Sequence, residues 1–237
     1  MHSFTFSKKV FLFFLMISAV AVHINVWAAE EPTIIPAPAL EQSKAESGLQ
    51  TAVLAGGCFW GVQGVFQRVR GVKKVWSGYA GGEKNTAKYE LIGTGKTGHA
   101  EAVEITFNPA EISYGELLHI FFSVAHDPTQ LNRQGPDTGT QYRSAIFYTD
   151  DAQKNVAEAY IAQLNGAKAF PKAIVTKLDP LKAFYKAEDY HQDFLIHNPL
   201  HPYIVHNDLP KIENLKRIFP VVYKGVPVKV TDKVIVH

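Results

Sequence analysis

The stretch T-A-V-L-A-G-G-C-F-W-G, residues 51–61, predicts the first strand of the domain and the start of its first helix. It opens with a short apolar run, which predicts a buried strand, and then reaches Gly56-Gly57, which predict a tight turn. Apolar side chains recur at helical spacing after the turn, at Phe59, Val62, Val65, Phe66 and Val69. The order of strand, turn and helix places Cys58, the single cysteine of the chain, at the start of a helix.

Further strand and helix patterns follow without a repeating strand-helix-strand period. Strands are predicted over residues 73–79, 100–107, 144–149 and 173–178. Helices are predicted after the capping box of Ser113 and Glu116, from Asp150 to about Leu164, and over residues 187–196 and 210–219. The pattern predicts a single α+β domain over residues 50–220, with helices packed on a mixed sheet in two layers. Residues 221–237 form a C-terminal extension that alternates like a strand, and we expect it to cover a sheet edge.

The N-terminus has the pattern of an export signal. Lys8 and Lys9 precede an apolar run of thirteen residues, 10–22, which is shorter than the about 20 residues that span a bilayer. Val26 and Ala28 suit a signal peptidase site, so residues 1–28 are predicted to be a signal peptide cleaved after Ala28. We therefore expect a periplasmic or secreted protein. The alternative is an uncleaved segment that anchors the chain to the membrane.

Residues 29–49 contain three prolines and four glutamates and show no apolar periodicity, so we expect a flexible linker. The whole chain of 237 residues is 46% hydrophobic and carries a formal charge of +2, which is too small to indicate a nucleic-acid partner. An exported chain with one cysteine cannot form an internal disulfide. Its thiol is therefore either buried and inert or reactive.

The surroundings of Cys58 favour a reactive thiol over a buried structural cysteine. Unpaired amides and the positive dipole end at a helix start lower the pKa of a thiol, which predicts a nucleophilic thiolate. Phe59 and Trp60 point about 100° apart on a helix, so both cannot face one small region of the core. Two aromatic side chains beside the thiol predict an apolar pocket for a small alkyl or thioether group.

Six sequence blocks occur in a specific order along residues 51–220. They are G-C-F-W-G (57–61), G-Y-A-G-G (78–82), T-G-H-A-E-A-V (97–103), H-D-P (126–128), R-Q-G-P-D-T-G-T-Q-Y-R-S (133–144) and A-E-D-Y-H-Q (187–192). In this order they resemble the A-type peptide methionine sulfoxide reductases. The resemblance implies a ferredoxin-like βαβ core. It also implies reduction of methionine S-sulfoxide, in proteins and as the free amino acid, which repairs oxidised proteins.

The resemblance assigns the chemical step to three kinds of side chain. Cys58 is the nucleophile, which attacks the sulfoxide sulfur and becomes a sulfenic acid. Phe59 and Trp60 hold the ε-methyl group of the substrate. Glu101 binds and protonates the sulfoxide oxygen, and burial is expected to raise its pKa so that it remains a proton donor near neutrality.

The same resemblance assigns supporting roles around the sulfoxide oxygen. Tyr89 and Tyr142 match two tyrosines whose hydroxyl groups hydrogen-bond this oxygen. Asp137 matches an acidic residue that orients this polar shell, and His191 matches a substrate-binding residue of the pocket. Phe194 stands where some members have tyrosine, so this edge of the pocket is expected to differ.

The chain lacks the resolving cysteines that many members carry near the C-terminus, and in this it resembles the single-cysteine branch. An external thiol must therefore reduce the Cys58 sulfenic acid. The candidates are glutathione, a thioredoxin-like domain and a glutaredoxin-like domain. No bound cofactor or metal is implied. We expect a monomer that acts on oxidised proteins and peptides and has no membrane contact after signal cleavage.

Two other functions remain as alternatives from the residues alone. A cysteine hydrolase or acyltransferase would pair Cys58 with one of the ten histidines, although no sequence feature selects the partner. A module that only binds oxidised methionine would need the aromatic pocket and would have no use for a thiolate.

Overall fold

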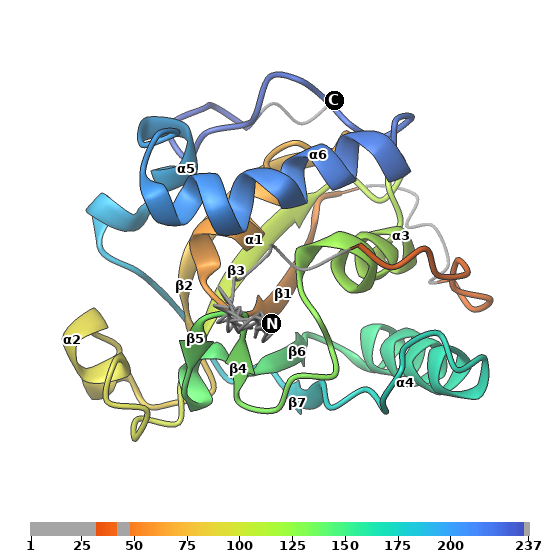
Figure 1. Ribbon diagram of the computed structural model, residues 1–237, viewed down its shortest axis with the longest axis horizontal. Coiled ribbons are helices and arrows are strands. Elements are labelled where there is room, and N and C mark those ends of the chain that lie inside the picture. Colours follow the sequence, from red (N-terminus) through yellow and green to blue (C-terminus); the bar gives the residue numbers. More distant parts are fainter. Residues whose placement is uncertain (1–31, 42–47, 235–237) are drawn as a thin grey trace, which may run out of the picture.

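The computed structural model describes residues 32–41 and 48–234, and the predicted signal peptide lies outside these ranges. A six-stranded sheet forms the centre of the domain, with the strand order β7-β6-β1-β3-β2-β8 (Figure 1). Its strands are β1 (Gln50–Gly56), β2 (Val72–Ala80), β3 (Ala100–Phe107), β6 (Ser144–Tyr148), β7 (Lys177–Pro180) and β8 (Phe184–Lys186). A separate small hairpin joins β4 (Arg133–Gln134) to β5 (Asp137–Thr138).

The central part of the sheet is a split β-α-β unit. The chain runs through β1, α1 (Phe59–Phe66), β2, β3, α3 (Tyr114–Ile120) and β6, and these strands lie in the order β6-β1-β3-β2 with antiparallel neighbours. This is the β-α-β-β-α-β arrangement of ferredoxin-like domains. The outer strand β7 pairs parallel to β6, so the sheet is mixed. The predicted α+β class with this core is confirmed.

Helices cover one face of the sheet and add a further layer outside it. Besides α1 and α3, the helices are α2 (Tyr89–Ile92), α4 (Asp151–Gly166), α5 (Phe194–His197) and α6 (Leu209–Ile218). Short helical turns are η1 (Lys84–Thr86), η2 (Phe121–Ala125), η3 (Thr140–Tyr142), η4 (Asp189–His191) and η5 (Ile204–Asp208). Helix α6 packs on α1 and η2 rather than on the sheet, so the predicted two layers are supplemented by a partial third one (Figure 1).

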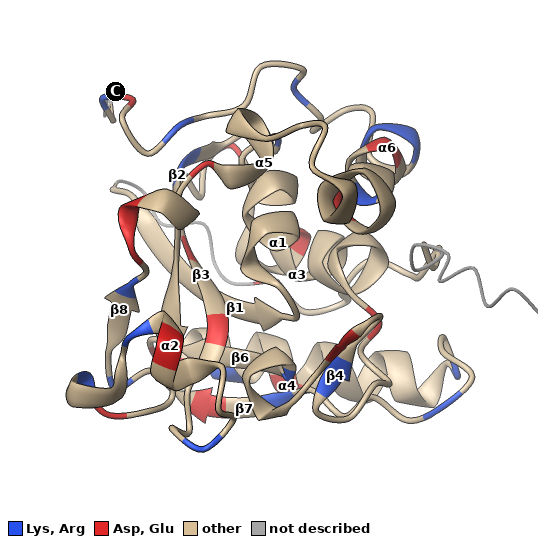
Figure 2. Ribbon diagram, turned by 60° about the vertical axis from the view of Figure 1, so that its left-hand side comes forward, with Lys and Arg blue, Asp and Glu red and all other residues tan. Residues whose placement is uncertain are grey.

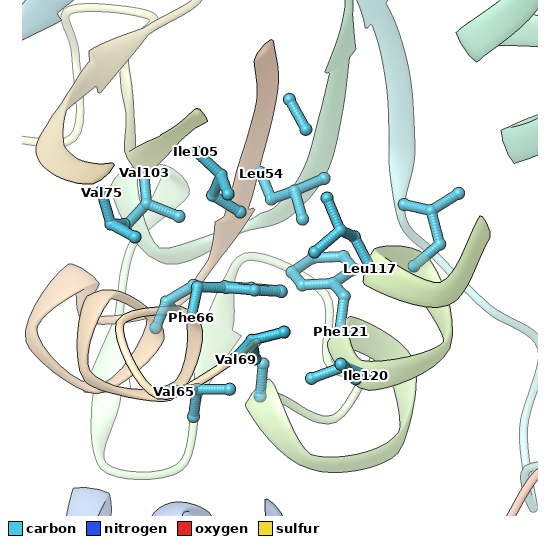
Figure 3. Packing of buried hydrophobic residues seen from close by; sticks show 14 of the residues in the cluster. Leu54, Val65, Phe66, Val69, Val75, Val103, Ile105, Leu117, Ile120 and Phe121 are labelled. Atoms are coloured by element: carbon cyan, nitrogen blue, oxygen red, sulfur yellow. The ribbon is translucent and has the colours of Figure 1, made fainter. Parts of the chain in front are cut away.

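The main core lies between the sheet and the α1–α3 layer. Side chains of β1, β2 and β3 meet those of α1 and α3, including Leu54, Val75, Val103, Ile105, Phe66, Leu117 and Phe121 (Figure 3). Burial of these side chains stabilises the domain by roughly 1.5–3 kcal/mol for each large one. A smaller cluster on the opposite face consists mostly of alanines of the central strands. Acidic and basic residues are distributed over many elements (Figure 2).

Two predicted helix starts are confirmed by their caps. The hydroxyl of Ser113 accepts a hydrogen bond from the Glu116 N–H at 3.0 Å, and the Glu116 carboxylate accepts one from the Ser113 N–H at 2.7 Å. The Asp150 carboxylate accepts a hydrogen bond from the Gln153 N–H at 2.8 Å, which starts α4. These caps satisfy amides that have no partner within the helix.

The prediction of one helix over residues 187–196 is wrong. The segment forms the turn η4 and the short helix α5, separated by Asp193 in the left-handed region with φ 55°. The Asp193 N–H donates to Gln63 Oε1 at 2.9 Å, and Asp193 Oδ1 accepts from Gln67 Nε2 at 2.5 Å. These bonds to α1 and its end override the local helical pattern. The predicted strand over 173–178 is also displaced, because β7 begins only at Lys177.

The prediction of a flexible linker over 29–49 is wrong for residues 32–41. Ile35 is buried, and its carbonyl lies 3.0 Å from His119 Nε2 of α3. The Tyr160 hydroxyl of α4 donates to the Pro36 carbonyl at 2.8 Å. Proline favours the extended backbone that such a packed strap requires, so the composition fits this structure as well as it fits a tether.

The prediction that the C-terminal extension covers a sheet edge is also wrong. Within the described part, up to residue 234, the extension makes one isolated bridge, between Val69 and Tyr223, and no strand. Its Val228 N–H donates to the Gln67 carbonyl at 2.9 Å, just beyond α1. No helix in the described ranges combines the length and the apolar character needed to cross a membrane.

Candidate active site

A tight turn between β1 and α1 positions the thiol of Cys58. Gly57 has φ +88°, and a Cβ at this position would lie 2.5 Å from Gln134 Cβ. Only glycine combines this dihedral with such a close approach. Cys58 therefore occupies the N-cap position of α1, as predicted, and is only 9% exposed.

Glu101 lies beside Cys58 because β3 pairs with β1. Its Oε2 accepts a hydrogen bond from the Phe59 N–H at 3.1 Å, and the residue is 2% exposed. The pKa of Glu101 is raised to about 8, mainly by burial and in part by Asp137, while the hydrogen bond from the Phe59 amide opposes the shift. The direction agrees with the sequence-based expectation. Glu101 is therefore mainly protonated at neutral pH and can donate its proton.

The expected low pKa of the Cys58 thiol is contradicted. Burial raises this pKa well above its ordinary value, and the carboxylates of Glu101 and Asp208 raise it further. The hydrogen bond from the Trp60 amide is the one cause that lowers it. The helix start does stabilise a thiolate, but desolvation and neighbouring carboxylates outweigh this effect. These surroundings therefore favour the neutral thiol of Cys58.

Tyr89 and Tyr142 lie near these two groups, as predicted. Both are half-buried, and burial raises the pKa of Tyr89 to about 12 and also raises that of Tyr142. Glu101 and Cys58 interact electrostatically with both phenols and raise their pKa values further. The two hydroxyl groups therefore remain protonated hydrogen-bond donors.

Asp137 belongs to the same group, and its partner was not predicted. The Tyr203 hydroxyl donates a hydrogen bond to Asp137 Oδ2. Burial raises the pKa of Asp137, and this hydrogen bond lowers it. Tyr203 lies just before η5 and edge-on to Trp60, with ring centroids 5.9 Å apart. Its position in the loop after α5 gave no signal in the sequence.

Aromatic rings form one wall of the site. Phe59 is buried, and its ring centroid lies 5.0 Å from that of His191. Trp60 is partly exposed, donates from Nε1 to His191 Nδ1 at 3.1 Å, and stacks on Phe194 at 3.7 Å. His191 also lies 4.3 Å from the Tyr89 ring. The structure therefore brings together Cys58 and the other seven predicted site residues.

Glu188, in the A-E-D-Y-H-Q block, is a further residue of the site that the sequence did not single out. Its Oε2 accepts from the Tyr79 hydroxyl at 2.7 Å, and its Oε1 accepts from the Tyr89 N–H at 3.0 Å. Its carbonyl accepts from the His191 N–H at 2.9 Å. One residue thus connects strand β2, helix α2 and turn η4 around Glu101.

Asp208 and Lys211 are a second missed feature. Both are buried, and Lys211 Nζ lies 3.6 Å from Asp208 Oδ1. The signal available in the sequence was Gly61, whose lack of a side chain leaves room for the Asp208 carboxylate. Residues 32–41 and 48–234 contain no group of three or more side chains suited to hold a metal ion.

Comparison with known proteins agrees with this arrangement. A family model described as peptide methionine sulfoxide reductase matches residues 50–220. Peptide methionine sulfoxide reductase MsrA 2 of Mesorhizobium japonicum is 62% identical over 187 residues, which are 79% of this chain and 96% of the relative. The protein of the same name from Synechocystis is 54% identical over 187 residues, covering 78% and 87%.

Two solved structures show a similar fold. The reduced form of Mxr1 from Saccharomyces cerevisiae gives a TM-score of 0.58 with 34% identity, over 67% of this chain and 91% of that one. Methionine sulfoxide reductase A of Corynebacterium diphtheriae gives 0.56 with 33% identity, over 73% and 90%. The chain therefore belongs to the A-type peptide methionine sulfoxide reductases, a family of oxidoreductases.

Proposed function

We propose that this chain reduces the S epimer of methionine sulfoxide, in proteins and as the free amino acid, through a sulfenic acid on Cys58. The observation that carries the proposal is the bond between Glu101 Oε2 and the Phe59 N–H at 3.1 Å. It holds a carboxyl group beside the first amide of α1, next to the thiol. A proton donor and a sulfur nucleophile therefore face the same space.

The proposed step conserves atoms and electrons. Glu101 gives its proton to the sulfoxide oxygen while Cys58 Sγ attacks the sulfoxide sulfur, and the thiol proton returns to Glu101. The oxygen is transferred to Cys58 as a sulfenic acid, and methionine leaves as the reduced thioether. Tyr89 and Tyr142 donate hydrogen bonds to the oxygen, Asp137 orients this polar shell, and Phe59, Trp60 and His191 enclose the methyl group.

An external thiol completes the cycle, because Cys58 is the single cysteine of the sequence. The thiol attacks the sulfenic acid, water leaves, and a second thiol reduces the mixed disulfide. Glutathione, a thioredoxin-like domain and a glutaredoxin-like domain all supply this chemistry. The reaction repairs oxidised proteins.

The test uses purified protein with dithiothreitol and a peptide that contains both epimers of methionine sulfoxide. We expect mass spectrometry and chiral separation to show loss of the S epimer alone, and Cys58→Ser to abolish the reaction. A wild-type protein that leaves the S epimer intact would falsify the proposal. If Cys58→Ser bound the peptide and turned it over, the thiol mechanism would be excluded. Repeating the assay with glutathione and with a thioredoxin system identifies the reductant.

We also propose export to the periplasm or the medium, since residues 1–28 have the pattern of a signal peptide. N-terminal sequencing of the protein isolated from its cell should begin at residue 29. A chain that retains residues 1–28 and sediments with membranes would instead support the anchored alternative.

A further inference from the structure

Asp208 is a fully buried carboxylate in the segment between α5 and α6. It ends η5 and precedes α6, and it is 0% exposed. Among the described residues, neither of its carboxylate oxygens has a hydrogen-bond partner. The cation beside it is Lys211, whose Nζ lies 3.6 Å away and whose side chain is 9% exposed. A buried carboxylate that accepts no hydrogen bond is costly to maintain.

The carboxylate packs against the same helical turn as the thiol. A Cβ at Gly61 would lie 2.1 Å from Asp208 Oδ1 and 3.3 Å from Lys211 Nζ. Gly61 is the third residue of α1, and Cys58 is its N-cap. A side chain at the N-cap reaches toward the amides of the second and third helical residues.

Electrostatic interactions independently indicate that Asp208 is near the reacting sulfur. The pKa of the Cys58 thiol is raised by Asp208 more than by Asp137. Cys58 and Asp208 also both raise the pKa of Tyr203. The pKa of Asp208 is raised to about 7, because burial outweighs the opposing effect of Lys211. The carboxyl group can therefore gain and lose a proton near neutral pH.

A structural role alone does not explain this pair. Replacing a buried ion pair by apolar side chains is often neutral or stabilising, so such a pair is weak evidence for stability. A carboxyl group whose pKa is shifted by burial, next to a nucleophile, is instead typical of proton transfer. Glu101 already serves the sulfoxide from the β3 side. Asp208 lies on the α6 side, and the proposed reduction of the sulfoxide by Cys58 does not require it.

We propose that Asp208 donates the proton when an external thiol reduces the Cys58 sulfenic acid. This inference rests on the proposed function. The thiol sulfur forms a bond to Cys58 Sγ, the Sγ–O bond breaks, and the oxygen leaves as water with the proton of Asp208. Lys211 stabilises the Asp208 carboxylate that this leaves. The proton of the attacking thiol is then transferred to this carboxylate. The thiol sulfur is oxidised, Cys58 is reduced from sulfenic acid to mixed disulfide, and a second thiol releases Cys58.

The experiment separates the two halves of the cycle in Asp208→Asn. Without reductant, the variant should form one equivalent of methionine in rapid quench at least as fast as wild type, because the lost Asp208 charge no longer raises the pKa of the Cys58 thiol. With dithiothreitol, the variant should lose the sulfenic oxygen about 100-fold more slowly than wild type. Mass spectrometry of the intact protein measures this loss. Glu213→Gln, which removes an exposed carboxylate from the same helix, serves as the matched control and should leave both rates unchanged.

A second variant separates proton donation from the loss of charge balance around Lys211. Asp208→Asn combined with Lys211→Met removes both charges and retains the volume. The proposal expects this double variant to resolve the sulfenic acid as slowly as Asp208→Asn. Recovery of the wild-type rate would show that Asp208 only neutralises Lys211, and the proposal would be wrong. If the wild-type protein formed no methionine at all, the proposed function would fail instead.

Discussion

Two regions enclose Cys58, and they are held in place by different kinds of interaction. Residues 50–107 supply Cys58 and Glu101 on a strand ladder, in which β1 and β3 pair from Gln50↔Phe107 to Leu54↔Val103. Residues 187–219 supply His191, Tyr203 and Asp208 on loops and short helices. Side-chain hydrogen bonds, such as those of Glu188 and Asp193, fix most of this second region.

The two regions contribute differently to the site. Backbone ladders are cooperative and tolerate loss of one side chain, so the first region offers a fixed position for the thiol and the acid. A loop fixed by a few side chains depends on each of them. Changes in the first region should therefore affect reduction of the sulfoxide itself, whereas changes in the second region, apart from those at Asp208, should affect positioning and stability.

The largest expected effect is that of Glu101→Gln in the first region. The amide can hydrogen-bond the sulfoxide oxygen but cannot readily protonate it, so the rate of methionine formation should fall about 100-fold with little change in substrate affinity. Single-turnover kinetics of wild type and Glu101→Gln measure the rate. Affinity is measured by equilibrium binding of a sulfoxide peptide to Cys58→Ser and to the double variant Cys58→Ser with Glu101→Gln, neither of which consumes the peptide. A loss of affinity as large as the loss of rate would assign Glu101 to binding only.

The raised pKa of Glu101 also predicts how stability depends on pH. The carboxyl group titrates near 4.3 when unfolded and at about 8 in the fold, so the native state binds the proton more tightly. This contribution is fully present below about pH 4.3 and is lost as the pH rises toward 8. Between pH 5 and 7, wild type should lose about 2–3 kcal/mol relative to Glu101→Gln. Urea unfolding of both proteins at several pH values checks this, and parallel curves would contradict it.

In the second region, Glu188→Ala should reduce kcat/KM about tenfold, because the Tyr79 hydroxyl and the Tyr89 N–H lose their common acceptor. Glu188→Gln keeps an oxygen for the Tyr89 N–H and should recover part of the activity. The effect should be smaller in a Tyr89→Phe background, since part of it acts through the Tyr89 hydroxyl. A full tenfold loss in that background would show that Glu188 does not act through Tyr89.

The same division explains what the sequence could predict. In the first region the signals are local: an apolar run, two glycines and a helical period predict the turn at Cys58, and β3 spans the expected residues 100–107. In the second region the helical pattern of 187–196 is interrupted by bonds between Asp193 and side chains of residues 63–67. These partners are distant in the sequence, so no local sequence pattern predicts the interruption. Tyr203 and Asp208 were not predicted for the same reason. The pKa of Cys58 was predicted in the wrong direction because it depends on burial and on carboxylates that are distant in the sequence.

The smallest expected effect lies outside both regions, in the strap of residues 32–41. Ile35 is buried near α3 and α4, so Ile35→Ala should lower the free energy of unfolding by about 1–2 kcal/mol. Activity should not change, because the hydrogen bonds of the strap go to α3, η2 and α4 rather than to the turn of Cys58 or residues 187–219. Urea unfolding and the dithiothreitol assay measure the two quantities, and Ile34→Ala, an exposed neighbour in the same strap, is the matched control. Equal stability of the two variants would show that the strap is not packed in solution. A loss of activity in Ile35→Ala alone would instead connect the strap to the site, and the division into two regions would then have to include a third.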